Sequence, residues 1–319
     1  MNQNVAYVPL KNGGKTLLID TDIGPDCDDA GALALAAVLA EKYHVPVCSV
    51  VSCTSSRYGA PCAEAICRYC GLEVGIYAEN KLPWLLTREN NMRYNRMIAE
   101  RFGVRKDYPD AVSAYRRVLA SLPDGGAVLV AIGPFATLAQ LMESSADGYS
   151  DLPGHALFAK KVSAVVTMSG KYPAGREYNI CCDPVSAIAF FETCRVPILF
   201  ADFDVGYSVR SGFPALESPR LDDPVYLSYL YYCADGDHTK ELMNASYDLV
   251  AMHFAFEGVS ELFGLSEPER FTVLDNGDDE FLPDPTGNCR RIIKRVPDET
   301  LGAYYNGILS SLMFRSGRQ

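Results

Sequence analysis

Apolar and polar residues alternate in blocks along most of the chain. Short runs rich in valine, isoleucine and leucine predict buried strands, and longer runs rich in alanine and leucine predict helices. The predicted strands cover residues 16–19, 45–51, 72–77, 127–132, 162–168 and 196–202, and the predicted helices cover residues 30–40, 59–69, 111–120, 135–142 and 184–192. This alternation predicts an α/β fold with a mostly parallel, open sheet that carries helices on both faces.

The pattern changes towards the C-terminus. The segments predicted there are helices at 223–233 and 245–256, a hairpin at 270–281 around Asn276-Gly277, a strand at 290–295 and a last helix at 299–314. We expect a single domain over residues 1–319, with a core at about 15–257 and a small helical and hairpin elaboration at 258–319.

A long polar and aromatic segment, residues 78–110, interrupts the alternation. It contains Trp84 and a predicted helix at about 91–101. A long insertion beside an active face either acts as a lid or substrate loop or packs on the surface. The sequence leaves both interpretations open.

The first predicted strand runs directly into an acidic loop. Five aspartates follow within ten residues: Asp20, Asp22, Asp26, Asp28 and Asp29. Two unit charges 4 Å apart repel by about 4 kcal/mol at an effective dielectric constant of about 20, and a helix N-terminus returns only about 0.3–1 kcal/mol for each anion. A hard cation such as Ca²⁺ or Mg²⁺ would compensate the rest. The alternative is a solvated turn in which one aspartate caps the helix, although the flanking residues are more apolar than in an ordinary surface turn.

Composition narrows the range of partners. The chain has 319 residues, 48% of them hydrophobic, and a net charge of −11, which argues against a general binder of nucleic acids or anionic membranes. No apolar run reaches the length of a membrane span and the first residues lack a signal-peptide core, so we expect a cytoplasmic protein. The 11 cysteines lie mostly in apolar stretches, which indicates reduced, buried thiols. Cys67 and Cys70 form a C-x-x-C motif. No second pair of cysteines at zinc-ligand spacing follows, which argues against a metal or redox site there.

Polar groups follow several predicted strands at their carboxyl ends, where ligands bind in sheets of this kind. Besides the aspartates, the groups are Thr54, Ser55 and Ser56, the backbone of Ile132-Gly133, and then Glu177, Asn179 and Asp183. Asp248 begins another apolar helix far downstream. If the sheet has the predicted topology, these groups lie together at the carboxyl ends of its strands.

Four segments, in the same order, resemble the calcium-dependent, inosine/uridine-preferring nucleoside hydrolase family. DTDIGPDCDDAGAL is similar to the family signature D-T-D-x-G-x-D-D-A-x-A-L. The supporting matches are VAIGPFATLAQ at 130–140, MSG…REYNICCDP at 168–184 and SYDLVA at 246–251. The similarity covers roughly the first 255 residues and implies the Rossmann-like nucleoside hydrolase fold.

The resemblance also implies a reaction and the residues that perform it. The implied activity is cleavage of the N-glycosidic bond of ribonucleosides or a related N-riboside, in purine or pyrimidine salvage, by a metal-bound water that Asp22 activates. The implied metal ligands, for one Ca²⁺ per subunit, are Asp22, Asp29, the main-chain oxygen of Ile132 and Asp248. The implied substrate-binding residues are Asp28, Ser55, Met168, Glu177 and Asn179. A homodimer or homotetramer is implied as well.

The sequence departs from the family pattern in several places. Two extra residues stand between Gly24 and the Asp28-Asp29 pair, so Asp26 either enters the metal shell or fills a bulge. Tyr247 replaces the family's histidine and is a second catalytic candidate, which would donate a proton, stack on the base or simply pack. We expect His253, one turn after Asp248, to be a core histidine.

These departures leave two alternatives to a nucleoside hydrolase. One is a non-catalytic or altered-specificity relative that binds ribose or a nucleoside. The other is a Mg²⁺-dependent phosphohydrolase that would use Asp20 and Asp22, although Gly24 stands where that family has threonine or valine.

Overall fold

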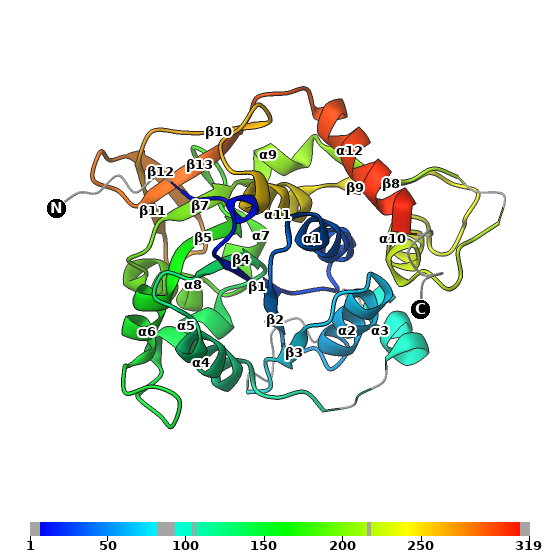
Figure 1. Ribbon diagram of the computed structural model, residues 1–319. Helices are drawn as coiled ribbons and strands as arrows, with labels where there is room; N and C mark the ends of the chain where they lie inside the picture. The colour runs from blue at the N-terminus through cyan, green and yellow to red at the C-terminus, as the bar shows by residue number, and fades with distance from the viewer. Residues whose placement is uncertain (1–6, 82–92, 104, 106, 216–217, 313–319) are drawn as a thin grey trace.

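The fold is organised around a sheet with seven parallel strands, whose carboxyl ends all point the same way. The computed structural model describes residues 7–81, 93–103, 105, 107–215 and 218–312. Within them, one 11-stranded sheet has the order β3-β2-β1-β4-β5-β7-β13-β11-β12-β6, and β10 pairs with β13 (Figure 1). The parallel strands are β1 (Thr16–Thr21), β2 (Val47–Ser52), β3 (Gly75–Ala78), β4 (Ala127–Ile132), β5 (Val162–Met168), β7 (Ile198–Ala201) and β13 (Cys289–Lys294). The antiparallel strands are β6 (Ala174–Gly175), β10 (Phe263–Leu265), β11 (Glu269–Val273) and β12 (Asp279–Pro283).

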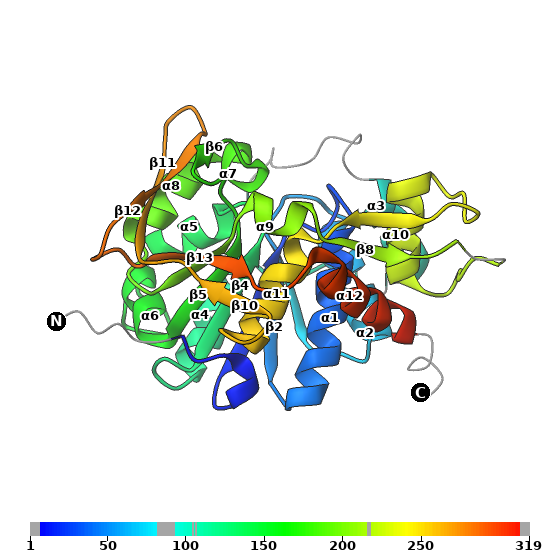
Figure 2. The same ribbon diagram turned by 90° about the horizontal axis from the view of Figure 1, so that it is seen from above.

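Both faces of the sheet are covered because alternate side chains of each strand point to opposite sides. In β4, Val128 and Val130 join one apolar cluster, whereas Leu129 and Ala131 join the other. The helices of the first cluster are α1 (Asp28–Tyr43), α2 (Gly59–Tyr69), α3 (Arg93–Phe102), α10 (Pro224–Ala234), α11 (Tyr247–Glu257) and α12 (Asp298–Ser311). Those of the second are α4 (Ala111–Ser121), α5 (Ala136–Glu143), α6 (Gly154–Lys161) and α8 (Pro184–Thr193). Figure 2 shows these two groups from above.

Helix α1 lies at the centre of the first face. Every residue from Asp28 to Ala40 is buried, which explains why the run is apolar on all sides instead of having one apolar stripe. It packs against α11, α2, α10 and α12. The helix therefore carries the aspartates of its first turn into the interior.

The structure confirms the predicted α/β fold and most of its elements. The helix predicted to begin at Ala30 begins at Asp28, and the helix predicted from 245 begins at Tyr247. The hairpin β11–β12 forms as predicted, and β13 lies parallel to β7, so the C-terminal segment extends the main sheet. The sequence did not predict α6, η1 (Leu10–Asn12), α7 (Tyr178–Cys182), α9 (Phe203–Tyr207), β10, or the separate pair β8 (Arg210–Phe213) and β9 (Leu242–Ala245). Trp84, in the proposed lid segment, lies outside the described residues.

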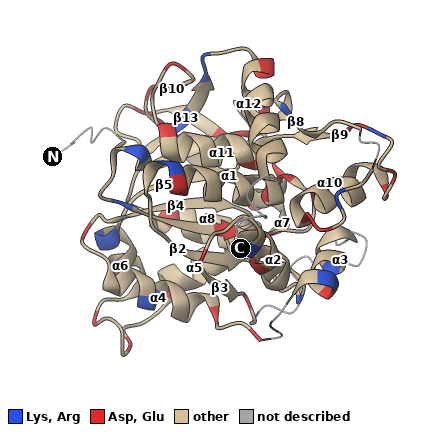
Figure 3. Ribbon diagram, turned by 45° about the vertical axis from the view of Figure 1, so that its right-hand side comes forward, with Lys and Arg blue, Asp and Glu red and all other residues tan. Residues whose placement is uncertain are grey.

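Basic residues are dispersed in the view of Figure 3, and the described helices are short. Lysines and arginines are spread there over separate helices and loops, among them α3 and α6. None of the helices in the described part of the chain combines the length and the apolar character that a bilayer-spanning helix needs.

Candidate functional site

The site forms where the strand order reverses, between β1 and β4. Thr21 pairs with Ile132 at the ends of these two parallel strands. A Cβ atom on Gly133 would stand 2.8 Å from the backbone nitrogen of Asp22, so only glycine allows this close approach. The turn after β4 thus lies directly against the turn after β1, as expected at a switch point of a parallel sheet.

Two helix N-termini meet above these strand ends. The backbone N–H of Asp248, in the first turn of α11, donates a hydrogen bond of 2.9 Å to Oδ2 of Asp28, in the first turn of α1. On the strand side, the Thr21 hydroxyl donates to Oδ1 of Asp29. Residues separated by 220 positions are therefore joined, and both helix termini favour negative charge.

Four carboxylates form what we call the acidic group: Asp26, Asp28, Asp29 and Asp248. One oxygen of each lies within 4.8 Å of the others. Asp28 and Asp29 are 1% exposed, Asp248 is 5% exposed, and Asp26 is half-buried. Burial, and then the charges of their neighbours, raise the pKa values of Asp28, Asp29 and Asp248 well above the usual range. Such a group holds its negative charge only beside a cation.

The donor set fits a divalent ion. Calcium binds carboxylate oxygens at about 2.3–2.6 Å, so oxygens on opposite sides of the ion stand about 4.6–5.2 Å apart. The four oxygens of the acidic group lie within 4.8 Å of one another, close enough to share one ion. Of the predicted metal ligands, Asp29 and Asp248 belong to the group, whereas Asp22 lies beside it, within hydrogen-bonding reach of Asp29. Burial, followed by the charges of Asp29 and Asp26, raises the pKa of Asp22.

A cavity of about 340 Å³ opens above the acidic group. Its lining residues are Asp22, Pro25, Asp26, Asp28, Ile132, Met168, Glu177, Tyr178, Asn179, Phe203, Tyr232, Tyr247 and Asp248. The structure thus brings the predicted site residues together, with two exceptions in the lining. Asp29 lies beneath the cavity, and Ser55 is half-buried in the loop after β2, outside the lining.

Glu177 and Asn179 form a rigid pair on one wall. Glu177 caps α7, and its carboxylate accepts hydrogen bonds from the backbone N–H groups of Asn179 (2.9 Å) and Ile180 (3.2 Å). The Asn179 side chain donates to the backbone oxygen of Met168 (3.1 Å). Burial outweighs these hydrogen bonds and raises the pKa of Glu177 to about 7. Both side chains are therefore fixed before any ligand enters.

Aromatic side chains form the opposite wall. Phe203 and Tyr247 lie with their ring centres 5.3 Å apart, and Tyr207 stacks on Phe203 from outside, also at 5.3 Å. Tyr178 and Tyr232 are partly exposed and complete the lining. Burial and then the charges of Asp28 and Asp26 raise the pKa of Tyr247. No lysine, arginine or histidine occurs in this lining as far as the described residues define it.

Two other candidates from the sequence lie elsewhere. Asp20 accepts hydrogen bonds from Tyr115 (2.7 Å) and Thr137 (2.9 Å) on the α4–α5 face, and burial raises its pKa to about 7. His253 lies in the core, with its Nδ1 atom 3.2 Å from the Tyr305 hydroxyl. The prediction of a core histidine is therefore confirmed.

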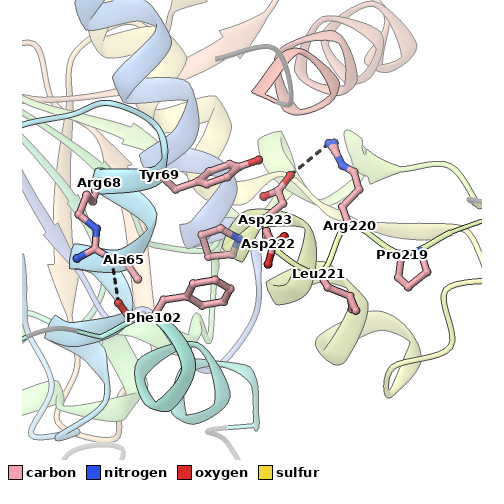
Figure 4. A pocket seen from close by; sticks show the side chains of 10 residues that line it. Ala65, Arg68, Tyr69, Phe102, Pro219, Arg220, Leu221, Asp222 and Asp223 are labelled. Carbon is pink, nitrogen blue, oxygen red and sulfur yellow. Dashed lines mark hydrogen bonds and ion pairs between the residues drawn. The ribbon is translucent and has the colours of Figure 1, made fainter. Parts of the chain in front are cut away.

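A larger hollow of about 660 Å³ lies between α2, α3 and the segment before α10 (Figure 4). Its polar groups are mostly paired with each other. Arg68 donates to the backbone oxygen of Phe102 (3.1 Å), and Arg220 pairs with Asp223 (3.3 Å). It does not include the acidic group, so the smaller cavity is the candidate site.

Comparison with known proteins agrees with this site. The family model described as inosine-uridine preferring nucleoside hydrolase matches residues 17–266. A search of curated proteins gave no match. Among solved structures, the chain is similar to a plant nucleoside hydrolase, PpNRh1 (17% identity, TM-score 0.65, covering 94% of this chain and 100% of that one). It is also similar to a purine-preferring ribonucleoside hydrolase from Gardnerella vaginalis (17% identity, TM-score 0.68, covering 93% of this chain and 99% of that one). A third similar structure is the type III effector XopQ complexed with adenosine diphosphate ribose (15% identity, TM-score 0.66, covering 96% of each chain). At these identities the structures show the shared fold, and the family match confirms the resemblance read from the four segments.

Proposed function

The chain belongs to the inosine-uridine preferring nucleoside hydrolase family, and from this premise we propose that it hydrolyses the N-glycosidic bond of a ribonucleoside in the cavity above the acidic group. The observation that carries the proposal is the meeting of Asp248 with the loop between β1 and α1. The loop supplies Asp26, Asp28 and Asp29, the start of α11 supplies Asp248, and together they form the floor of a cavity.

The acidic group would hold one divalent ion, which we propose to be calcium. Magnesium demands about 2.0–2.1 Å and near-ideal octahedral geometry, whereas calcium tolerates six to eight irregular oxygen ligands. Asp29 and Asp248 are the proposed central ligands, supplemented by Asp22 and the main-chain oxygen of Ile132. When bound, such an ion supplies a positive centre that orients a water and the sugar diol. We propose that Asp26 also belongs to this shell, in keeping with the insertion before Asp28.

The side chains around the ribose would divide the remaining work. Asp22 borders both the acidic group and the cavity, where it would accept a proton from the attacking water. Asp28, Glu177 and Asn179 would hold the sugar hydroxyls, and Met168 would pack beneath the ring. Positive charge develops on the sugar as its bond to the base breaks, and the carboxylate-rich floor stabilises that charge.

The aromatic wall points to a leaving group with a flat ring. Phe203 and Tyr247 offer ring faces for stacking, and such contacts contribute about 0.5–1.5 kcal/mol beyond burial. Because its pKa is raised, Tyr247 holds its proton firmly and is a weaker general acid than an unperturbed tyrosine. We therefore propose stacking and hydrogen bonding to the base as its main contribution.

The absence of lysine, arginine and histidine from the described lining supports a second candidate, a relative that binds a nucleoside or riboside without turnover. The family match speaks against the phosphohydrolase alternative.

One assay separates the two remaining candidates. The purified protein is incubated with inosine, uridine or adenosine in calcium, and free ribose is measured by a reducing-sugar assay. Release that stops on chelation and returns with calcium supports hydrolysis. Binding of the same nucleosides by calorimetry without ribose release would support the non-catalytic candidate and reject our proposal.

A further inference from the structure

Two free thiols meet beside the acidic group. Sγ of Cys27 and Sγ of Cys233 lie 4.0 Å apart, although their positions differ by 206 residues. Cys27 is fully buried and precedes the first turn of α1, between Asp26 and Asp28. Cys233 is partly exposed near the end of α10, next to Tyr232 of the cavity lining. A bond between them would join the floor of the site to its wall.

The packing of the two helices holds this pair in place. One turn further along α1, a Cβ atom on Gly31 would stand 2.5 Å from the hydroxyl oxygen of Tyr229, which lies one turn before Cys233 on α10. The two contacts are successive layers of one helix–helix interface. Glycine at position 31 lets the two helices pack this closely, so the two sulfurs lie near each other in the folded protein.

We propose that Cys27 and Cys233 are a redox modification site that forms a reversible disulfide with hydrogen peroxide as the oxidant. Cys233 reacts first because it is the exposed partner. Its thiolate sulfur attacks one peroxide oxygen, the O–O bond breaks, and the products are a sulfenic acid and hydroxide, which takes a proton to become water. The Cys27 sulfur then attacks the sulfenic sulfur, and the displaced hydroxide leaves as water with the Cys27 proton. Overall, two thiols lose two electrons and two protons, and one peroxide becomes two waters.

Bond formation should disturb the acidic group. The sulfurs must approach from 4.0 Å to about 2.05 Å. Cys27 lies between two members of the acidic group, so movement of its backbone displaces carboxylate oxygens whose spacing suits a cation. We infer that the disulfide weakens cation binding and, by linkage, that a bound cation disfavours the disulfide at equilibrium. This coupling rests on the proposed cation site, whereas the disulfide itself does not.

Peptide mapping tests the bond without any assay of activity. The reduced, full-length protein is treated with a small excess of hydrogen peroxide, alkylated, digested and analysed by mass spectrometry. The expected product is a linked pair of peptides containing Cys27 and Cys233, which dithiothreitol separates. Cys233→Ser should abolish the link. Cys182→Ser, which changes another half-buried thiol near the cavity, should leave it intact. Failure to find the link in wild-type protein, or pairing of Cys233 with another cysteine, overturns the proposal.

The coupling has its own measurement. In a dithiothreitol redox buffer, saturating calcium chloride should lower the equilibrium constant for disulfide formation about fivefold or more, within the usual range of coupling between sites. Calorimetric titration with calcium should show correspondingly weaker binding to the oxidised protein. If the equilibrium constant of the disulfide is the same with and without calcium while calcium binds the reduced protein, the coupling is wrong. If calcium does not bind the reduced protein at all, the proposed cation site fails and the disulfide result is unaffected.

Discussion

The backbone N–H of Asp248 donates a 2.9 Å hydrogen bond to Oδ2 of Asp28. This bond joins the first turns of α11 and α1, which otherwise belong to distant parts of the chain. One oxygen of Asp28 is thereby used in fixing geometry, and the carboxylate also belongs to the acidic group. The contact makes the position of Asp248 dependent on the acidic loop, and the reverse is also true.

Asp248→Asn should remove the cation from the site. The substitution keeps the backbone N–H that holds Asp28 but deletes one charge from the acidic group. We expect calcium affinity to fall by more than about 100-fold, because changing even the partners of metal ligands costs about 10–100-fold. Calorimetric titration measures the affinity. Asp223→Asn, which changes an equally buried capping aspartate outside the acidic group, should bind calcium like the wild type. Unchanged affinity in Asp248→Asn would mean that the ion binds elsewhere.

Asp22→Asn should abolish turnover while leaving the fold intact. Asparagine occupies nearly the same volume but cannot take a proton from water, and a positioned base contributes about 10²–10⁴-fold. We expect kcat to fall by a factor in that range, with an unchanged circular dichroism spectrum. Asp20→Asn serves as the neighbouring control, because Asp20 faces Tyr115 and Thr137 instead of the cavity. Full activity in Asp22→Asn would show that another group is the base.

Most of this site could be predicted from the sequence by the rule that ligands bind at the carboxyl ends of parallel strands. Asp22 follows β1, Ile132 ends β4 and Glu177 lies in the segment after β5, so their meeting required only the correct strand order. Phe203 also follows a predicted strand directly, but an apolar residue at a strand end carries no sign of function when only polar groups are taken as candidates. The same rule extended to aromatic residues would have found it.

Other features depend on packing that no local pattern encodes. Tyr232 reaches the cavity because α10 lies against α1, and nothing near position 232 indicates that contact. The sequence could not predict whether Asp26 enters the metal shell, because the two extra residues in its loop have no regular geometry from which to place the side chain. The proximity of Cys27 to Cys233 has the same origin as that of Tyr232.

Tyr247→Phe and Tyr247→Ala should separate stacking from acid catalysis. Phenylalanine keeps the ring against Phe203 and loses only the hydroxyl, whereas alanine loses both. If stacking dominates, Phe should change kcat by less than about fivefold, and Ala should raise KM by about 2–10-fold, the equivalent of 0.5–1.5 kcal/mol. Steady-state kinetics with inosine measure both constants. A large loss of kcat in Tyr247→Phe, with KM unchanged, would instead make the hydroxyl the proton donor.

His253 should make the protein sensitive to acid. Burial is the main cause that lowers its pKa from 6.5 to about 4, and its ring stacks on Tyr304 at 4.8 Å. Below pH 6.5 the unfolded chain binds a proton that the folded chain refuses, so stability falls as the pH drops from about 6.5 towards 4. At about 1.4 kcal/mol per pKa unit, this loss reaches about 3 kcal/mol. Urea unfolding at several pH values should therefore give a shallower acid decline for His253→Phe than for wild type. His155→Gln, at an exposed position, should follow the wild type. Parallel declines in His253→Phe and wild type would mean that His253 does not govern the acid response.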